Sequence, residues 1–169
     1  MERDQKLSSG DTLLDFNDNG IKLKITGTVY QSDGKSSAAG VILYNYHTNQ
    51  KGVYPIQGDE MGWAKRHGYI RGWVKIDING GYSFYTLKPG TYPNRTQPAH
   101  IHLTILEPDG KYYWLGSHFF EDDSLLTEKE KSPSSAKGGS SGILRLRKEN
   151  NLFVGKRDII LGFNVPGYE

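Results

Sequence analysis

The sequence predicts an all-β protein, an antiparallel β-sandwich with long loops and at most one short helix. Runs of β-branched and aromatic residues recur along most of the 169-residue chain, and turns rich in Gly, Asn and Asp separate them. Many short strands with a turn signal roughly every 8 to 12 residues are typical of a sandwich or a barrel. Helical periodicity is weak throughout.

The expected strands follow one another with short turns between them. The full set covers residues 21–30, 40–46, 73–78, 82–87, 100–106, 112–115, 143–147 and 157–163. Residues 73–78 and 82–87 are expected to pair as a hairpin, because Gly80 and Gly81 between them can adopt positive φ. Residues 112–115 are expected to pair back onto 100–106 after the turn at 108–110.

The remaining segments are assigned by composition. The best helical candidate is 124–131, with Ser124 in the position of an N-cap. Residues 132–142, which are rich in Ser and Gly, are interpreted as a flexible insertion, and residues 1–19 as an extended N-terminal tail. The length suits one domain, so we assign residues 1–169 to a single sandwich.

Composition excludes several classes of protein. A net charge of +2 argues against a nucleic-acid partner, which needs clustered positive charge, and no apolar run approaches the roughly 18 residues of a membrane span. The absence of cysteine excludes disulfides and thiolate sites. The first residues lack the apolar stretch of a signal peptide. We therefore expect a soluble protein, either cytoplasmic or the mature form of an exported one, for which a homo-oligomer is compatible with the sequence.

Two histidines share one face of a predicted strand. In residues 100–106 the side chains of His100 and His102 alternate with Ile101 and Leu103, so both imidazoles project from the same face. Two imidazoles on one face can bind one metal ion. The alternative is a pair of ordinary half-buried strand histidines, and these residues alone favour neither.

Two tyrosines occupy similar loop positions. Tyr54 and Tyr92 each follow a glycine by two residues and directly precede a proline, which restricts the local backbone. A phenol with an ordinary pKa of about 10 becomes a useful ligand only for a strongly Lewis-acidic cation such as ferric iron. Because the chain has 11 tyrosines, packing in the sheet is the commoner role for any one of them.

The stretch from Arg71 to His102 resembles the catalytic domain of the intradiol ring-cleavage dioxygenases, the family of protocatechuate and catechol dioxygenases. The resemblance is carried by residues 71–93, which read RGWVKIDINGGYSFYTLKPGTYP, and by PAHIH at residues 98–102. It extends over residues 20–123, where residues 52–54 resemble the first tyrosine motif of the family.

This resemblance implies a β-sandwich that holds non-haem Fe(III) between two Tyr and two His. By motif position the metal ligands are Tyr54, Tyr92, His100 and His102, and Tyr54 is also expected to take a proton from the substrate. Phenolates and neutral imidazoles form a hard N/O set that suits ferric iron. The implied reaction cleaves a catechol-type ring with O2, between its two hydroxyl-bearing carbons, to a muconate-type diacid.

The chain departs from the family pattern beyond these ligands. Family members usually carry Arg three residues before the first histidine, where this chain has Gln97, and Ser117 replaces a second-layer Gln. Gln offers only a dipole where Arg offers a fixed charge, so the efficiency of catalysis through Gln97 is in question. Arg71 or Arg95 is the candidate for supplying that charge.

Other readings of the same residues compete with this one. A cupin also has His-x-His on a strand, with Glu107 at a suitable distance, but Asn94 replaces the usual glycine six residues before His100. A metal-free transthyretin-like or carboxypeptidase-regulatory-like sandwich shares the strand patterns and would be a binding module. Such a module has no reason to bring two tyrosines and two histidines together.

Several further residues have open or structural assignments. Trp63, Arg66 and Tyr69 either line the mouth of the pocket or pack on the surface. The other histidines are expected to be surface or packing residues; they are His47, His67 and His118.

Overall fold

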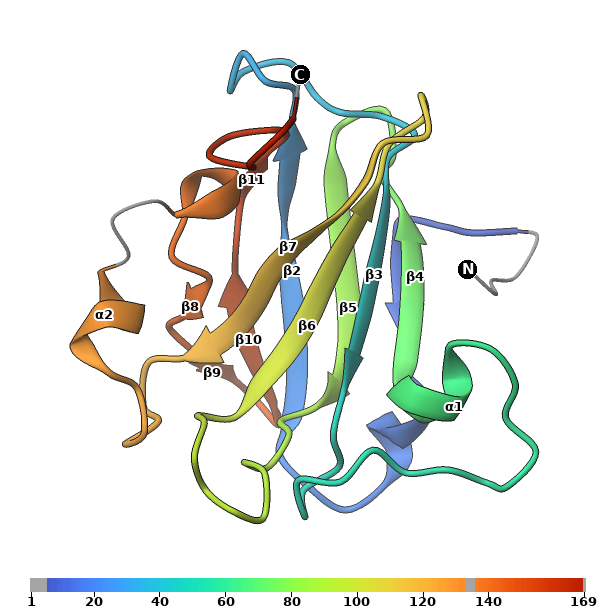
Figure 1. Ribbon diagram of the computed structural model, residues 1–169, viewed down its shortest axis with the longest axis vertical. Coiled ribbons are helices and arrows are strands. Elements are labelled where there is room, and N and C mark those ends of the chain that lie inside the picture. Colours follow the sequence, from blue (N-terminus) through green and yellow to red (C-terminus); the bar gives the residue numbers. More distant parts are fainter. Residues whose placement is uncertain (1–5, 133–135, 169) are drawn as a thin grey trace.

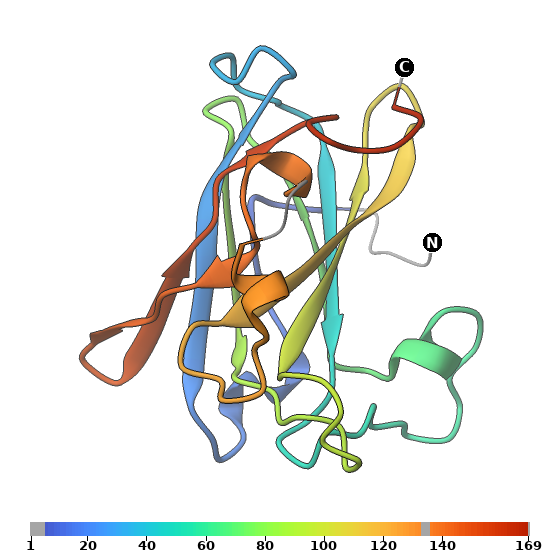
Figure 2. The same cartoon turned by 60° about the vertical axis from the view of Figure 1, so that its left-hand side comes forward.

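The computed structural model describes residues 6–132 and 136–168 and arranges them as two facing β-sheets (Figure 1). The first sheet contains, in spatial order, β1 (Gly10–Thr12), β5 (Gly81–Leu87), β2 (Lys22–Tyr30), β10 (Leu152–Lys156) and β9 (Arg147–Glu149), with β11 (Ile159–Ile160) beside β2. The second contains β4 (Arg71–Lys75), β3 (Ile42–His47), β6 (His100–Leu106), β7 (Tyr112–Phe120) and β8 (Ile143–Leu144). Figure 2 shows the two layers from the side.

The predicted all-β sandwich is confirmed, with two differences in detail. The long central strands pair antiparallel, whereas the short strands β1, β8 and β11 pair parallel to their neighbours. β10 pairs parallel to β2 and antiparallel to β9. The described residues also hold two single-turn α-helices rather than at most one. They are α1 (Ala64–His67) and α2 (Glu128–Lys131), and the 3-10 turns are η1 (Leu14–Asn17) and η2 (Lys137–Gly139).

The helix expected at 124–131 is shorter than predicted. It begins only at Glu128, because Thr127 rather than Ser124 is the N-cap. Thr127 accepts from the amide of Glu130, while the Glu130 side chain accepts from the amide of Thr127. This capping box satisfies two amide groups that the first turn leaves without helical partners.

Residues between the two sheets form the core. Strand alternation buries Leu23 and Ile25 of β2 and Ile101 and Leu103 of β6 completely or almost completely. Since the inner face of β6 carries these apolar residues, its other face, with the two histidines, points away from the core.

The expected hairpin between residues 73–78 and 82–87 is wrong. β4 pairs with β3 in the second sheet, and β5 pairs with β2 in the first. Gly80 has the expected positive φ of 83°, and the Asp77 carboxylate accepts from the amides of Asn79 and Gly81. The turn is therefore real, but it carries the chain from one sheet to the other.

The N-terminal residues take part in the sandwich. Residues 1–5 lie outside the described residues, but beyond them β1 pairs with β5, and Leu13 and Asp15 are buried. In the predicted insertion at 132–142, residues 133–135 also lie outside the description, and η2 follows with Gly138 buried. No helix of the described chain is long and apolar enough to cross a membrane.

Candidate metal centre

The candidate centre lies at one end of the second sheet, on its outer face. His100 and His102 are half-buried there and alternate with the buried Ile101 and Leu103, as their spacing predicts. β6 lies between β3 and β7, with Tyr46 of β3 paired to His102. The two imidazoles therefore project from the central strand of the sheet, which is hydrogen-bonded on both sides.

Hydrogen bonds between two loops bring the tyrosines to the same place. Tyr54 lies beyond β3 and Tyr92 lies beyond β5. The amide of Gly90 donates to the carbonyl of Asn49 at 3.0 Å, and the hydroxyl of Thr48 donates to the carbonyl of Gly90 at 3.0 Å. These bonds join the end of β3 to the loop that carries Tyr92.

Two glycines permit the close approach of these loops. Gly52 has a φ of 75°, and a Cβ there would collide with the carbonyl oxygen of Thr91. A Cβ on Gly90 would collide with the carbonyl oxygen of Gln50. Only residues without a side chain allow the two backbones to touch in this way.

The four side chains converge through their polar atoms. The Tyr54 hydroxyl lies 2.8 Å from the Tyr92 hydroxyl and 2.9 Å from Nε2 of His102. Nε2 of His100 lies 3.4 Å from the Tyr92 hydroxyl and 3.2 Å from Nε2 of His102. Two phenol oxygens and two imidazole nitrogens thus face one another around a common point.

The backbone fixes the orientation of one imidazole. Nδ1 of His100 lies 2.8 Å from the carbonyl oxygen of Pro98, which can only accept, so Nδ1 carries a proton and donates. In the neutral ring Nε2 then keeps its lone pair, directed toward the phenols. For His102, the Ser117 hydroxyl lies 3.5 Å from Nδ1, on the side of the ring away from Tyr54.

The local environment keeps His102 and Tyr54 uncharged. Burial, reinforced by the nearby His100, lowers the pKa of His102 to about 3, so this ring is neutral at pH 7. Burial also raises the pKa of the Tyr54 phenol, which deprotonates only beside a strong positive charge. Among the described residues, no three His, Cys, Asp or Glu side chains form a group that could hold a metal ion. The tyrosines are therefore the side chains of this centre that could become anionic ligands.

A stack of rings supports His102, and sequence reasoning missed it. Tyr46 lies between two imidazoles, with its ring centroid 4.5 Å from that of His102 and 3.7 Å from that of His67. Tyr44 fixes His67 in turn through a hydrogen bond of 2.8 Å to Nδ1. Tyr44 and Tyr46 stand two apart in a predicted strand, so alternation places them on one face. That this is the face of His102 depends on the β3–β6 register.

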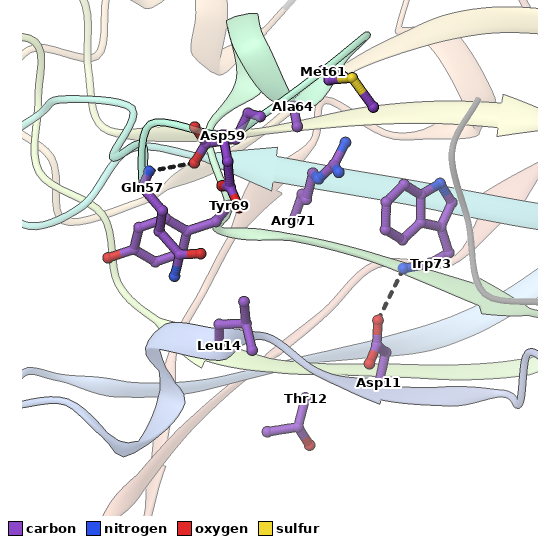
Figure 3. A pocket seen from close by; sticks show the side chains of 11 residues that line it. Asp11, Thr12, Leu14, Gln57, Asp59, Met61, Ala64, Tyr69, Arg71 and Trp73 are labelled. Carbon is purple, nitrogen blue, oxygen red and sulfur yellow. Dashed lines mark hydrogen bonds between the residues drawn. The ribbon is translucent and has the colours of Figure 1, made fainter.

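The predicted polar residues, Gln97 and Arg71, lie on a loop and on the edge strand β4. Gln97 is exposed on the loop before β6. Arg71, at the start of β4, has its guanidinium 5.1 Å from the centroid of Trp73. It lines a hollow of about 590 Å³ that is also lined by Asp59 and Glu60. Figure 3 shows Arg71 and Asp59 in this hollow. His102 lines a different hollow, described below.

The remaining histidines are packing residues, as expected. His67 belongs to the ring stack, while His47 and His118 are fully buried. The cupin reading is wrong, because Glu107 accepts hydrogen bonds from Tyr113 and Tyr168 and forms no group with the two histidines of β6.

Comparison with known proteins identifies the family. A family model described as Dioxygenase matches residues 2–154. Catechol 1,2-dioxygenase 1 of Acinetobacter lwoffii is 35% identical over 101 residues, which are 49% of this chain and 31% of that enzyme. The match therefore spans less than a third of that relative.

Solved structures share the fold. The dioxygenase domain of a dioxygenase carbohydrate-binding protein fusion from Streptomyces sp. SirexAA-E matches with a TM-score of 0.68 and 19% identity, over 92% of this chain and 90% of that one. An intradiol ring-cleavage dioxygenase from Tetranychus urticae matches with a TM-score of 0.64 and 18% identity, over 95% of this chain and 88% of that one. From the family model, the sequence relative and this common fold, the chain belongs to the intradiol ring-cleavage dioxygenase family.

Proposed function

We propose that this protein binds one ferric ion through Tyr54, Tyr92, His100 and His102 and cleaves a catechol-type ring between its two hydroxyl-bearing carbons. The substrates are the catechol and O2, and the product is a muconate-type diacid. Both atoms of O2 enter the product, so the reaction balances without a further reductant.

The observation that carries this proposal is the convergence of two phenols and two imidazoles. Outside a metal site, two imidazole Nε2 atoms 3.2 Å apart gain nothing from each other unless one carries a proton. Ferric iron suits this donor set, because phenolates balance its charge and neutral imidazoles complete a hard N/O environment. When bound, the ion would supply a Lewis acid that favours the deprotonated form of a catechol.

The protein residues have separate roles in this scheme. The carbonyl of Pro98 holds His100 in the tautomer whose Nε2 faces the cluster. Burial raises the pKa of the Tyr54 phenol, so a Tyr54 oxygen that had been deprotonated as an iron ligand would readily take a proton from an arriving catechol hydroxyl.

Gln97 and Arg71 are the polar residues proposed to act on the substrate. Gln97 precedes His100 by three residues, where its amide supplies a hydrogen bond in place of a charge. Arg71 is paired in register with Tyr46, which stacks on His102, and its positive charge is proposed to favour an anionic substrate there. If Gln97 limits the rate, a Gln97→Arg variant will cleave catechol faster than the wild type.

Iron binding is tested by colour and by elemental analysis. We expect iron-loaded protein to be red-brown from tyrosinate-to-iron charge transfer, with one iron per chain. A Tyr54→Phe, Tyr92→Phe double variant will lose the colour. The matched control is a Tyr30→Phe, Tyr85→Phe double variant, whose tyrosines lie on the first sheet and which will keep it.

Ring cleavage is tested separately by O2 consumption with catechol, protocatechuate and hydroxyquinol. Protein that contains iron but consumes no O2 with any catechol would contradict the enzymatic part of the proposal. Protein that takes up no ferric iron would contradict the whole of it and favour a metal-free binding sandwich.

A further inference from the structure

An aromatic hollow adjoins the candidate metal centre on the outer face of the second sheet. Its volume is about 440 Å³, and His102 forms part of its wall. The other aromatic residues that line it come from β3, from α1 and the residue before it, and from β7. They are Tyr46, Trp63, His67, Tyr112 and Trp114.

Ring contacts hold one side of this hollow in place. Tyr46 is stacked between His102 and His67, and Trp63 meets His67 edge-on with ring centroids 5.3 Å apart. Trp63 also meets Tyr112 edge-on at 5.7 Å, which closes the row across the sheet. The rings therefore form a continuous wall that begins at a candidate metal ligand.

The part of the hollow formed by β7 is exposed to solvent. Tyr112 is 48% exposed and Trp114 is 55% exposed. Large aromatic residues that gather around an exposed concave surface are typical of ligand sites, whereas single exposed ones need no explanation. An aromatic or conjugated group entering here meets ring faces and edges.

Charge distinguishes this hollow from its neighbour. Arg66 lines it, no acidic side chain does, and within the described residues no ion pair joins Arg66 to a carboxylate. The hollow of Figure 3 is instead lined by Asp11, Asp59 and Glu60. A carboxylate of a ligand is therefore favoured beside Arg66 rather than beside the three carboxylates of the neighbouring hollow.

We propose that the aromatic hollow binds the substituent of an extended catechol, one that carries a planar conjugated side chain ending in a carboxylate. The inference rests on the proposed function, because the catechol ring itself would be held at the four-residue cluster. The side chain then lies along the aromatic wall, and its carboxylate pairs with Arg66. Charge-assisted pairing and ring stacking together favour such substrates over unsubstituted catechol.

The test measures binding without turnover. Iron-loaded protein is titrated anaerobically with catechol, with 3,4-dihydroxycinnamate and with the uncharged amide of the latter. We expect the Kd of the dihydroxycinnamate to be at least about 10-fold lower than that of catechol. Arg66→Gln will remove most of this preference for the acid and little of the affinity for the amide. Tyr112→Ala will weaken the binding of the acid and of the amide to a similar extent.

Conservative and distant variants separate a direct role from a structural one. Arg66→Lys and Tyr112→Phe will retain most of the preference for the acid over catechol. Arg147 is an exposed arginine on β9, and Arg147→Gln will leave the preference unchanged. An acid-to-catechol preference that is absent in the wild type, or unchanged by both Arg66→Gln and Tyr112→Ala, would overturn the proposal.

The outcome for the subsite is distinguishable from the outcome for the proposed function. If catechol is cleaved but dihydroxycinnamate is not preferred, the function stands and the subsite does not. If the iron-free Tyr54→Phe, Tyr92→Phe variant still binds dihydroxycinnamate in a manner that depends on Arg66, the hollow is supported independently of any ring cleavage.

Discussion

His118 is a fully buried residue whose two ring nitrogens have no hydrogen-bond partner among the described residues. It lies opposite Ile101 on the inner face of β7, one position from Ser117, whose hydroxyl lies on the side of His102. The other core histidine, His47, has both nitrogens hydrogen-bonded, to the carbonyl of Thr48 and the hydroxyl of Thr86. A buried polar group without partners destabilises the fold.

We predict that His118→Leu stabilises the protein. The substitution removes two unpaired polar atoms and places an apolar side chain in the core, so the free energy of unfolding at neutral pH should rise by about 1 kcal/mol. Urea unfolding followed by fluorescence measures the difference. A loss of stability in the variant would show that His118 has a favourable polar contact.

The difference in unfolding free energy between His118→Leu and the wild type should increase at acidic pH. Burial holds the pKa of His118 well below its usual range, so near pH 5 the unfolded chain binds a proton there that the folded chain does not. The unfolding free energy of the wild type therefore falls as the pH drops below about 6.5, by about 2 kcal/mol at pH 5 from this residue. His118→Leu lacks this contribution. Equal acid sensitivity of both proteins would contradict the assignment.

For single residues, the sequence correctly predicted which side chains share one face of a strand. Alternation places His100 and His102 on one face, and the structure confirms it. The proximity of Tyr54 to Tyr92 could not be worked out from spacing, because it depends on backbone contacts between Gly52 and Thr91, far apart in the chain. Only the family resemblance suggested it.

Between elements, strand positions were predicted better than strand partners. The strand at 100–106 has the predicted bounds, and 112–115 pairs with it as the first part of β7. The turn at Gly80 was predicted correctly, yet the strands that flank it pair in different sheets. A turn sequence specifies a local bend, whereas the partner of each strand depends on burial against the opposite sheet.

We predict that Gly52→Ala disturbs the site and that Gly110→Ala does not. Both glycines have positive φ, of 75° and 91°, so each substitution costs about 1 to 2 kcal/mol of backbone strain. A Cβ at Gly110 meets open space, whereas one at Gly52 collides with the carbonyl of Thr91. Gly52→Ala will therefore be the more destabilised protein, and it alone will lose iron-dependent colour.

Thermal unfolding and iron content of the two variants measure this difference. The matched strain of Gly110→Ala separates the effect of φ from the effect of the loop contact. If Gly52→Ala binds iron as the wild type does, the contact between the two loops does not position Tyr54.

At the scale of the whole molecule, the N-terminal segment joins the two sheets along one side of the sandwich. β1 pairs with β5 of the first sheet, and the Asp11 carboxylate accepts from the amide of Trp73 in β4 of the second, at 2.9 Å. The amide of Lys75 donates to the carbonyl of Ser8 at 2.8 Å. The sequence suggested only an extended tail for residues 1–19.

We predict that Asp11→Ala lowers the stability of the entire fold. The substitution leaves the amide of Trp73 without its acceptor, which costs about 1 to 3 kcal/mol for a partly buried group. Asp11→Asn keeps a side-chain oxygen that can accept and should recover part of the loss. Asp18→Ala is the matched control, since Asp18 is exposed.

Because the segment contacts both sheets, urea unfolding of Asp11→Ala should remain a single transition with an unchanged slope and a lower midpoint. Two separate transitions would show instead that the first residues fold and unfold apart from the sandwich.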